Sequence, residues 1–186
     1  MTVEAAEALL TTLDPSMEKM ELAGFIDDSI TDGPGLRLAI FAQGCPHRCP
    51  GCQNPTTWNR GGGRVFTVAQ VVDRVAANRL VKGVTFSGGD PFFQPRPFAL
   101  LARSLRAAGY EVACYTGWTF EQLLASGDPY VRALLRMLDV LVDGPYVQAL
   151  GSYGLKFKGS SNQRTLDVQK SLQTGGAALM PVGRWN

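Results

Sequence analysis

Three of the chain's four cysteines stand within one short run of sequence. Cys45, Cys49 and Cys52 are spaced C-x3-C-x2-C, so any fold of this chain must bring three thiols together in a single loop. Thiolates are the usual ligands of iron–sulfur clusters, and a cluster whose irons are all bound by protein normally takes four of them. Three thiolates therefore predict a cluster with one iron left open to a substrate or cofactor.

A structural zinc ion is the alternative for these cysteines, with His47 as the fourth ligand of a Cys3His site. Zinc sites usually take paired ligands from two separated segments, whereas His47 lies between Cys45 and Cys49. The spacing favours a cluster and indicates that His47 supports the loop or is exposed. Cys114 lies in an apolar run, where a buried and unreactive thiol is expected.

The length of 186 residues, with 45% hydrophobic residues, predicts one compact core. A net charge of +2 with 18% charged residues gives no basic stripe for nucleic acid. Residues 1–20 lack a continuous apolar stretch, so neither a signal peptide nor a membrane span is expected. Clustered cysteines without a disulfide framework are typical of a reducing compartment, and we expect a cytoplasmic protein.

Beyond residue 20 the chain alternates between strand and helix patterns. The predicted strands are 22–26, 36–42, 84–86, 110–115, 139–142 and 165–168, and the predicted helices are 68–80, 97–108, 119–125 and 129–137. This alternation predicts an α/β fold with a parallel sheet and right-handed crossovers. Residues 1–20 show helical spacing interrupted at Asp14-Pro15, so we expect an N-terminal helical extension, 1–20, on a single domain, 21–186.

Four loops with candidate functional residues follow predicted strands. They are the cysteine loop, Ser87–Pro91, Thr116–Trp118 and Asp143–Pro145, with Thr116 and Asp143 as weaker candidates. In barrel-type α/β folds the working residues lie beyond the carboxyl ends of the strands, so we expect these loops to meet at one rim. A full eight-fold barrel needs about 250 residues. The shorter chain predicts a partial, laterally open (β/α) barrel, which suits a macromolecular substrate.

The cysteine spacing resembles that of the radical S-adenosylmethionine (SAM) enzymes. Gly88-Gly89-Asp90 follows the next predicted strand and is, taken alone, a common turn sequence. Glycines let the backbone approach a ligand closely, and a carboxylate can accept hydrogen bonds from an ammonium group. The segment is similar to the one with which radical SAM enzymes hold the methionine amino group of SAM.

This resemblance implies a [4Fe-4S] cluster on Cys45, Cys49 and Cys52, with SAM chelating the fourth iron through its amino and carboxylate groups. The residues implied to contact the cofactor are Gly51, Cys52, Gln53, Gly88, Gly89 and Asp90. The fold implied is the partial barrel of the radical SAM type.

Further motifs narrow the resemblance to one family. Asp32-Gly33-Pro34-Gly35 precedes the cysteine loop, and Gly159-Ser160-Ser161-Asn162-Gln163-Arg164 follows the last rim loop. The second motif has no generic catalytic pattern and by itself indicates a solvated loop. From about Leu22 to Leu172, however, the chain resembles the activating proteins of anaerobic ribonucleoside-triphosphate reductases. One departure is Gln53, where relatives often carry Tyr or Asn-type residues.

The resemblance implies an activity and partners. One-electron cleavage of SAM would yield a 5′-deoxyadenosyl radical, which would take a hydrogen atom from a glycine in the large catalytic subunit of the reductase. A flavodoxin-like protein is the expected electron donor, since the chain has no second cluster motif. A homodimer is a further expectation, while nucleic acid and membrane are not expected partners.

Three other functions stay open. The first is activation of another glycyl-radical enzyme, such as pyruvate formate-lyase, although many such activators are longer or carry additional cysteines. The second is radical SAM chemistry on a small molecule, as in a deazapurine-type cyclising enzyme. The third is a zinc or iron–sulfur binding module without catalysis. Metal analysis and a SAM-cleavage assay distinguish the third from the enzymes.

Overall fold

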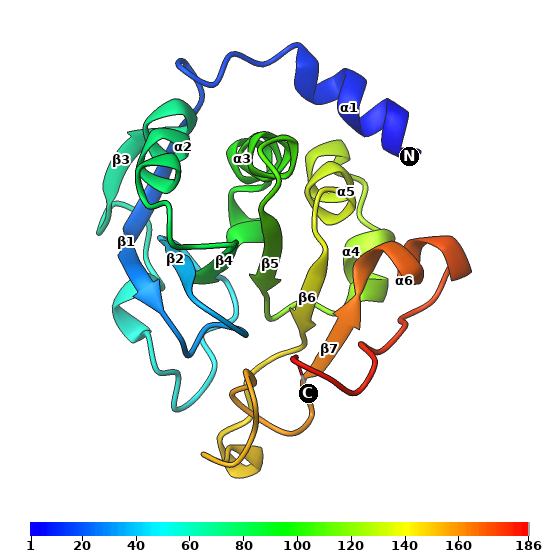
Figure 1. Ribbon diagram of the computed structural model, residues 1–186. Helices are drawn as coiled ribbons and strands as arrows, with labels where there is room; N and C mark the ends of the chain where they lie inside the picture. The colour runs from blue at the N-terminus through cyan, green and yellow to red at the C-terminus, as the bar shows by residue number, and fades with distance from the viewer. Residues whose placement is uncertain (186) are drawn as a thin grey trace.

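A computed structural model describes residues 1–185, and its seven strands form one mixed sheet (Figure 1). The strands are β1 (Lys19–Ser29), β2 (Arg37–Ala42), β3 (Arg64–Thr67), β4 (Gly83–Gly88), β5 (Glu111–Tyr115), β6 (Val140–Asp143) and β7 (Arg164–Asp167). The helices are α1 (Val3–Thr11), α2 (Val68–Ala77), α3 (Pro95–Ala107), α4 (Phe120–Leu124), α5 (Pro129–Arg136) and α6 (Val168–Thr174). Within the described residues, no helix combines the length and the apolar composition needed to cross a membrane.

The sheet has the order β3-β1-β2-β4-β5-β6-β7. The predicted parallel arrangement is confirmed for the four central strands, β2, β4, β5 and β6. It is wrong at the edges, where β1 pairs antiparallel with β2 and β3, and β7 pairs antiparallel with β6. The connection from β1 to β2 is a short turn, and a parallel pair would need a much longer crossover.

The N-terminal segment departs from the helical pattern predicted for residues 1–20. Helix α1 ends at Thr11 and buries Ala6 and Leu10 in the main core, but the expected second helical segment is absent. Met20 instead belongs to β1. Residues 14–18 form a single turn, in which Met17 N and Glu18 N donate to Asp14 O. The carbonyls of Pro15 and Glu18 accept hydrogen bonds from the first turn of α2 instead of continuing a helix.

Successive side chains of the central strands point to opposite faces of the sheet. On one face they pack against the helices, with the rings of Phe86 and Phe98 centred 5.1 Å apart. On the other face Ala113 and Val140 form a smaller cluster with Trp185. The helices therefore leave one face of the sheet to loops and to the C-terminal segment (Figure 1).

Trp185 anchors the C-terminal segment beneath the sheet, where the tryptophan is 1% exposed. Its ring lies 5.1 Å from the guanidinium carbon of Arg37 and 5.7 Å, edge to face, from the ring of Phe157. Main-chain hydrogen bonds between the tail and β7 fix its path, including Met180 N to Thr165 O at 2.8 Å. The tail thus covers the part of the helix-free face nearest the start of the parallel strands.

Candidate active site

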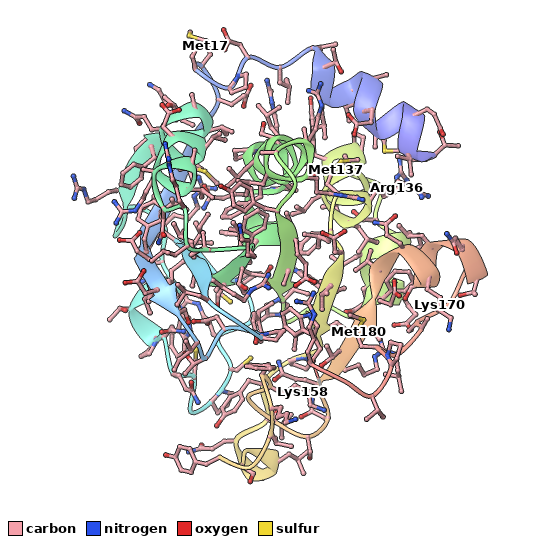
Figure 2. All side chains as sticks on the ribbon, in the orientation of Figure 1. Met17, Arg136, Met137, Lys158, Lys170 and Met180 are labelled. Atoms are coloured by element: carbon pink, nitrogen blue, oxygen red, sulfur yellow. The ribbon has the colours of Figure 1, made fainter. Side chains whose placement is uncertain are left out.

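A cavity of about 450 Å³ opens on the helix-free face at the carboxyl ends of the parallel strands. One wall consists of residues from the loops that follow the strands: Cys45, Cys49, Cys52, Ser87, Gly88, Gly89, Thr116, Gly117 and Gly144. The predicted convergence of four loops on one rim is therefore confirmed. The opposite wall comes from the segment 145–163, whose Lys158 lies below the sheet in Figure 2. The volume is typical of a site for a small molecule or cofactor.

All three clustered cysteines face this cavity as free, partly buried thiols. The loop that carries them turns sharply because Arg48 and Gly51 adopt left-handed φ angles of 48° and 73°. Its first residue is fixed by a hydrogen bond of 2.9 Å from Cys45 N to Trp58 O. The chain thereby presents three sulfur donors to one common space.

The donor set fits an iron–sulfur cluster. The backbone N–H of Asn54 donates to Cys52 Sγ at 3.4 Å, the kind of contact that stabilises a cluster-bound thiolate. Burial raises the pKa of Cys45, and the N–H groups of His47 and Arg48 oppose that rise. Burial therefore favours the protonated thiol. A bound metal displaces the thiol proton and stabilises the thiolate instead. Within residues 1–185, no three His, Cys, Asp or Glu side chains surround a position for one metal ion.

The residues predicted to contact SAM lie together, but not all on the cavity surface. Gln53, Gly88 and Gly89 line the cavity. Gly88 adopts a φ of 89°, and a Cβ there would lie 2.7 Å from Ala42 N. Gly51 faces the Gln148 side chain instead, since a Cβ on Gly51 would lie 2.5 Å from Gln148 Cδ.

Asp90 lies behind the cavity wall and is fully buried. Its carboxylate accepts hydrogen bonds from Phe92 N, the Thr116 hydroxyl and Gly117 N, and it also contacts His47 Nε2 at 2.8 Å. Asp90 therefore joins the glycine-rich loop to the two neighbouring rim loops. The sequence predicted that His47 supports the cysteine loop or is exposed. In the structure its imidazole is hydrogen-bonded to this carboxylate.

Several cavity residues were not predicted. Tyr115 and Phe157 contribute rings, and the Tyr115 hydroxyl donates to Phe157 O at 2.9 Å. Burial raises the pKa of Tyr115, so this hydroxyl stays protonated. Asp32 and Lys158 add one carboxylate and one ammonium group. Asp32 belongs to the motif Asp32-Gly33-Pro34-Gly35, but nothing in that motif indicated a place in the cavity. The other three residues occur without a local chemical motif, so only their proximity in the fold identifies them.

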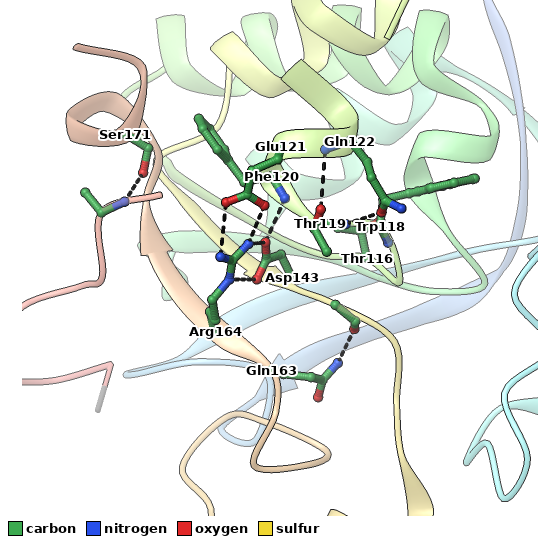
Figure 3. A network of polar contacts seen from close by, with 12 residues as sticks. Thr116, Trp118, Thr119, Phe120, Glu121, Gln122, Asp143, Gln163, Arg164 and Ser171 are labelled. Carbon is green, nitrogen blue, oxygen red and sulfur yellow. Dashed lines mark hydrogen bonds and ion pairs between the residues drawn. The ribbon is translucent and has the colours of Figure 1, made fainter. Parts of the chain in front are cut away.

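Cys114 and Asp143 lie away from the cavity surface. Cys114 is fully buried on the helix-covered face, as expected, and burial raises the pKa of its thiol well above the usual value. Asp143 is 1% exposed and accepts hydrogen bonds from Phe120 N at 2.7 Å and from Arg164 Nε at 2.9 Å (Figure 3). Asp143 thus fixes the start of α4 to β7.

The motif 159–164, which by itself indicated only a solvated loop, holds one wall of the cavity in place. Gln163 donates to Gly144 O at 2.9 Å (Figure 3) and accepts from Gly159 N at 2.9 Å. Asn162 donates to Pro145 O at 2.8 Å. These bonds tie both ends of the segment 145–159 together. The motif therefore shapes the cavity through its amide side chains.

Stability at low pH is expected to depend on Glu121. Arg164 donates to both Glu121 oxygens at 3.1 and 2.8 Å (Figure 3), and this lowers the pKa of the carboxyl from 4.5 to about 2. A lowered pKa stabilises the folded state above pH 4.5, and this contribution is lost as the pH falls from 4.5 to about 2. Because Glu121 is 56% exposed, we expect an effect of about 1 kcal/mol or less.

Urea unfolding of wild type and Glu121→Gln measures this contribution. The difference in unfolding free energy should be constant near neutral pH and should shrink below pH 4.5. A difference that grows on acidification would contradict the assignment of the lowered pKa to the Arg164 pair.

Comparison with known proteins agrees with this site. Residues 31–166 match the family described as a 4Fe-4S single cluster domain.

The anaerobic ribonucleoside-triphosphate reductase-activating protein of Escherichia coli K12 is 37% identical over 142 residues, covering 72% of this chain and 90% of that protein. The protein of that name from Enterobacteria phage T4 is 32% identical over 139 residues, covering 72% of this chain and 85% of its own length. Among solved structures, QueE from Escherichia coli aligns with a TM-score of 0.46 and 14% identity over 54% of each chain. The relatives, together with the family match, show that this chain belongs to the family of anaerobic ribonucleoside-triphosphate reductase-activating proteins.

Proposed function

We propose that this chain is a radical SAM activase that generates a glycyl radical on the anaerobic ribonucleoside-triphosphate reductase. The observation that carries the proposal is the arrangement of Cys45, Cys49 and Cys52 on one cavity, beside the backbone of Gly88 and Gly89. Family membership specifies the reaction, because the relatives are named as activating proteins of that reductase. The cofactors are a [4Fe-4S] cluster and SAM.

The three cysteines would hold the cluster and leave one iron for SAM. The chemistry supplied by the bound cofactors is one-electron cleavage of the sulfonium and removal of a hydrogen atom from a glycine of the partner. For the methionine end of SAM, the proposed contacts are Gly88 and Gly89. Asp90 was expected to accept hydrogen bonds from the ammonium group, but its carboxylate is buried and already accepts from donors of the chain, so its proposed role is indirect. The two glycines admit the cofactor close to the backbone, and Asp90 fixes them from behind.

Other residues of the cavity would orient the cofactor and exclude water. Cys52 and Gln53 line the cavity, and we keep them as proposed cofactor contacts. Gly51 was expected to be a third contact, but it faces Gln148, and its proposed role is to shape the loop. Tyr115 and Phe157 form an aromatic wall joined by a hydrogen bond of 2.9 Å. A closed wall of this kind limits quenching of a reactive species by solvent.

The sheet supports a partial, laterally open barrel as the finer description of the fold. The helices cover one face of the curved sheet, and the cavity lies on the other (Figure 1). We propose that the open side admits the glycine-bearing segment of the reductase.

The division into an N-terminal extension, 1–20, and a radical SAM domain, 21–186, remains part of the proposal, with α1 packed on the domain through Ala6 and Leu10.

The large catalytic subunit of the reductase is the proposed macromolecular partner. A flavodoxin-like protein is the proposed electron donor, because three of the four cysteines form a single group and the one left, Cys114, is too few for a second cluster. We further propose a cytoplasmic location and a homodimer. Size-exclusion chromatography with light scattering tests the dimer directly.

Anaerobic reconstitution with iron and sulfide, followed by reduction with SAM, tests the function. Release of 5′-deoxyadenosine together with a glycyl doublet in electron paramagnetic resonance of the added reductase subunit is the expected result. Cleavage without the doublet would favour a different glycyl-radical enzyme or a small-molecule substrate. A colourless zinc protein without cleavage would overturn the proposal.

Replacing Gly89 with alanine is expected to lower SAM cleavage about 100-fold, the scale of a small misplacement of reacting groups. A Cβ at Gly89 would lie 2.4 Å from Gly44 O and 3.0 Å from Ala42 O, so the backbone next to Cys45 must move. The measurement is 5′-deoxyadenosine release by reconstituted protein. Gly127→Ala is the matched control, since nothing lies within 4 Å of a Cβ there. Equal losses in the two variants would contradict the steric argument.

A further inference from the structure

The side chains of His47 and Asp90 join the interior of the cysteine loop to the glycine-rich loop. His47 lies between Cys45 and Cys49 in sequence, and its Nε2 atom is 2.8 Å from Asp90 Oδ2. The side chains are 15% and 1% exposed. Because a carboxylate oxygen accepts, the imidazole Nε2 donates. A hydrogen bond to a charged acceptor is stronger than a neutral one, and burial protects it from competing water.

The chain itself fills the hydrogen-bonding capacity of Asp90. Besides His47, the donors are Phe92 N at 2.9 Å, the Thr116 hydroxyl at 2.9 Å and Gly117 N at 3.0 Å. Phe92 N donates to Oδ1, whereas His47 and Gly117 N donate to Oδ2. The Thr116 hydroxyl lies 3.1 and 2.9 Å from the two oxygens, so these four donors account for the roughly four acceptor positions of a carboxylate. Asp90 is therefore an anchor for three loops, and the cysteine loop reaches it through the His47 side chain.

The imidazole ring of His47 is also held from its other side. The Trp118 ring packs against it edge to face, with centroids 4.8 Å apart. A Cβ on Gly117 would lie 2.4 Å from His47 Cδ2, and Gly117 does not adopt a left-handed φ. The glycine at this position is therefore required by the imidazole ring and not by backbone conformation.

Within the described residues, the other hydrogen bonds of the cysteine loop lead elsewhere. Cys52 N donates to Cys49 O inside the loop, and the Arg48 guanidinium donates to Asn59. The backbone before the loop bonds to the following segment, with Gly44 N donating to Thr57 O at 2.7 Å, and to the glycine-rich loop, with Gly44 O accepting from Asp90 N at 2.8 Å. The side chain that connects the interior of the loop to the glycine-rich loop is thus that of His47.

We propose that His47 is a positioning residue: its hydrogen bond to Asp90 fixes the cysteine loop, and hence the cluster, relative to Gly88 and Gly89. This inference rests on the proposed function, since it assigns the cluster to the three cysteines. Loss of the hydrogen bond leaves all three thiols present but frees the loop between Cys45 and Cys49. Such a site binds its cluster less tightly and holds it in a less uniform position.

Three variants test the proposal. His47→Leu keeps apolar volume beside Trp118 but removes the donor, whereas His47→Gln retains an amide N–H that can reach Asp90. Gly117→Ala leaves every bonding group in place and displaces the imidazole ring. Gly127→Ala is the control, because a Cβ there meets open space.

The primary measurement is the rate at which reconstituted protein loses iron to a chelator under anaerobic conditions. Second-sphere changes typically weaken a metal site by about 10- to 100-fold. We expect His47→Leu and Gly117→Ala to lose iron about tenfold faster than wild type, and His47→Gln to behave like wild type. The electron paramagnetic resonance spectrum of the reduced cluster should broaden in the first two variants and stay sharp in the third.

Two results would overturn the inference while leaving the proposed function intact. One is wild-type iron loss and an unchanged spectrum in His47→Leu. The other is iron loss in His47→Gln as fast as in His47→Leu, which would assign the effect to the ring and not to the hydrogen bond. If His47→Leu does not fold, Gly117→Ala against its control decides. A wild-type protein that takes up no cluster overturns the proposed function and this inference together.

Discussion

Replacing Cys49 with alanine is expected to abolish both cluster binding and SAM cleavage. Cys49 is the middle donor of the three and faces the cavity as a free thiol. With two thiolates left, two irons of a cubane cluster would lack protein ligands, and three-point attachment of the cluster is lost. Iron and sulfide analysis, visible absorbance and 5′-deoxyadenosine release measure the two effects on the same reconstituted sample.

The chain provides its own matched control in Cys114→Ala. Cys114 is fully buried on the helix-covered face and belongs to the main core. Its replacement removes one sulfur from the protein without touching the cavity, so the variant should load the cluster and cleave SAM. Full cluster content in Cys49→Ala, or its loss in Cys114→Ala, would show that the cluster is bound elsewhere.

Replacing Trp185 with alanine is expected to lower the free energy of unfolding by about 3–5 kcal/mol. The tryptophan is 1% exposed and fills the space between Arg37, Phe157 and the sheet. Its loss leaves a cavity beside the buried Arg37 guanidinium, which would then lose its aromatic cover. Urea unfolding of the metal-free protein, followed by circular dichroism, measures the change.

Val182→Ala is the control for a change in the same tail. Val182 is 97% exposed, so its truncation should alter the unfolding free energy by no more than about 0.5 kcal/mol. If Trp185→Ala were as mild as this control, the tail would be a loosely attached segment. A large loss in Trp185→Ala alone supports the tail as an integral part of the helix-free face.

The parts of the site that the sequence predicted are those with short spacing along the chain. Cys45, Cys49 and Cys52 share one loop because only a few residues separate them in the sequence. Gly88 ends β4 and Gly89 follows it, because a buried strand pattern ends there. The central parallel strands were predicted for a related reason, since alternating strand and helix patterns permit few topologies. These features were predictable because they depend on residue spacing, hydrophobic periodicity and turn-forming residues within short stretches of the sequence.

Other features had no local signal. β1 runs antiparallel to β2 because a short turn joins them, whereas β3 and β7 reach the edges of the sheet after the longer segments 43–63 and 144–163. Residues 12–18 do not continue a helix, and the carbonyls of Pro15 and Glu18 bond to the start of α2. The wall residues Tyr115, Phe157 and Lys158 became neighbours only when β5 and the segment 145–163 met.

The sequence by itself determined that three cysteines share one loop, that a glycine-rich segment ends the next strand pattern, and how strands and helices alternate in the central part of the fold. Tertiary structure alone decided that His47 meets Asp90, 43 residues away, and that Trp185 lies over Arg37. The physical reason is that spacing and periodicity report only which residues share one loop or one face. Hydrogen bonds and ring contacts between distant segments form only when the folded chain brings those segments together. The identity of a single histidine, aspartate or tryptophan does not indicate which residue it will contact.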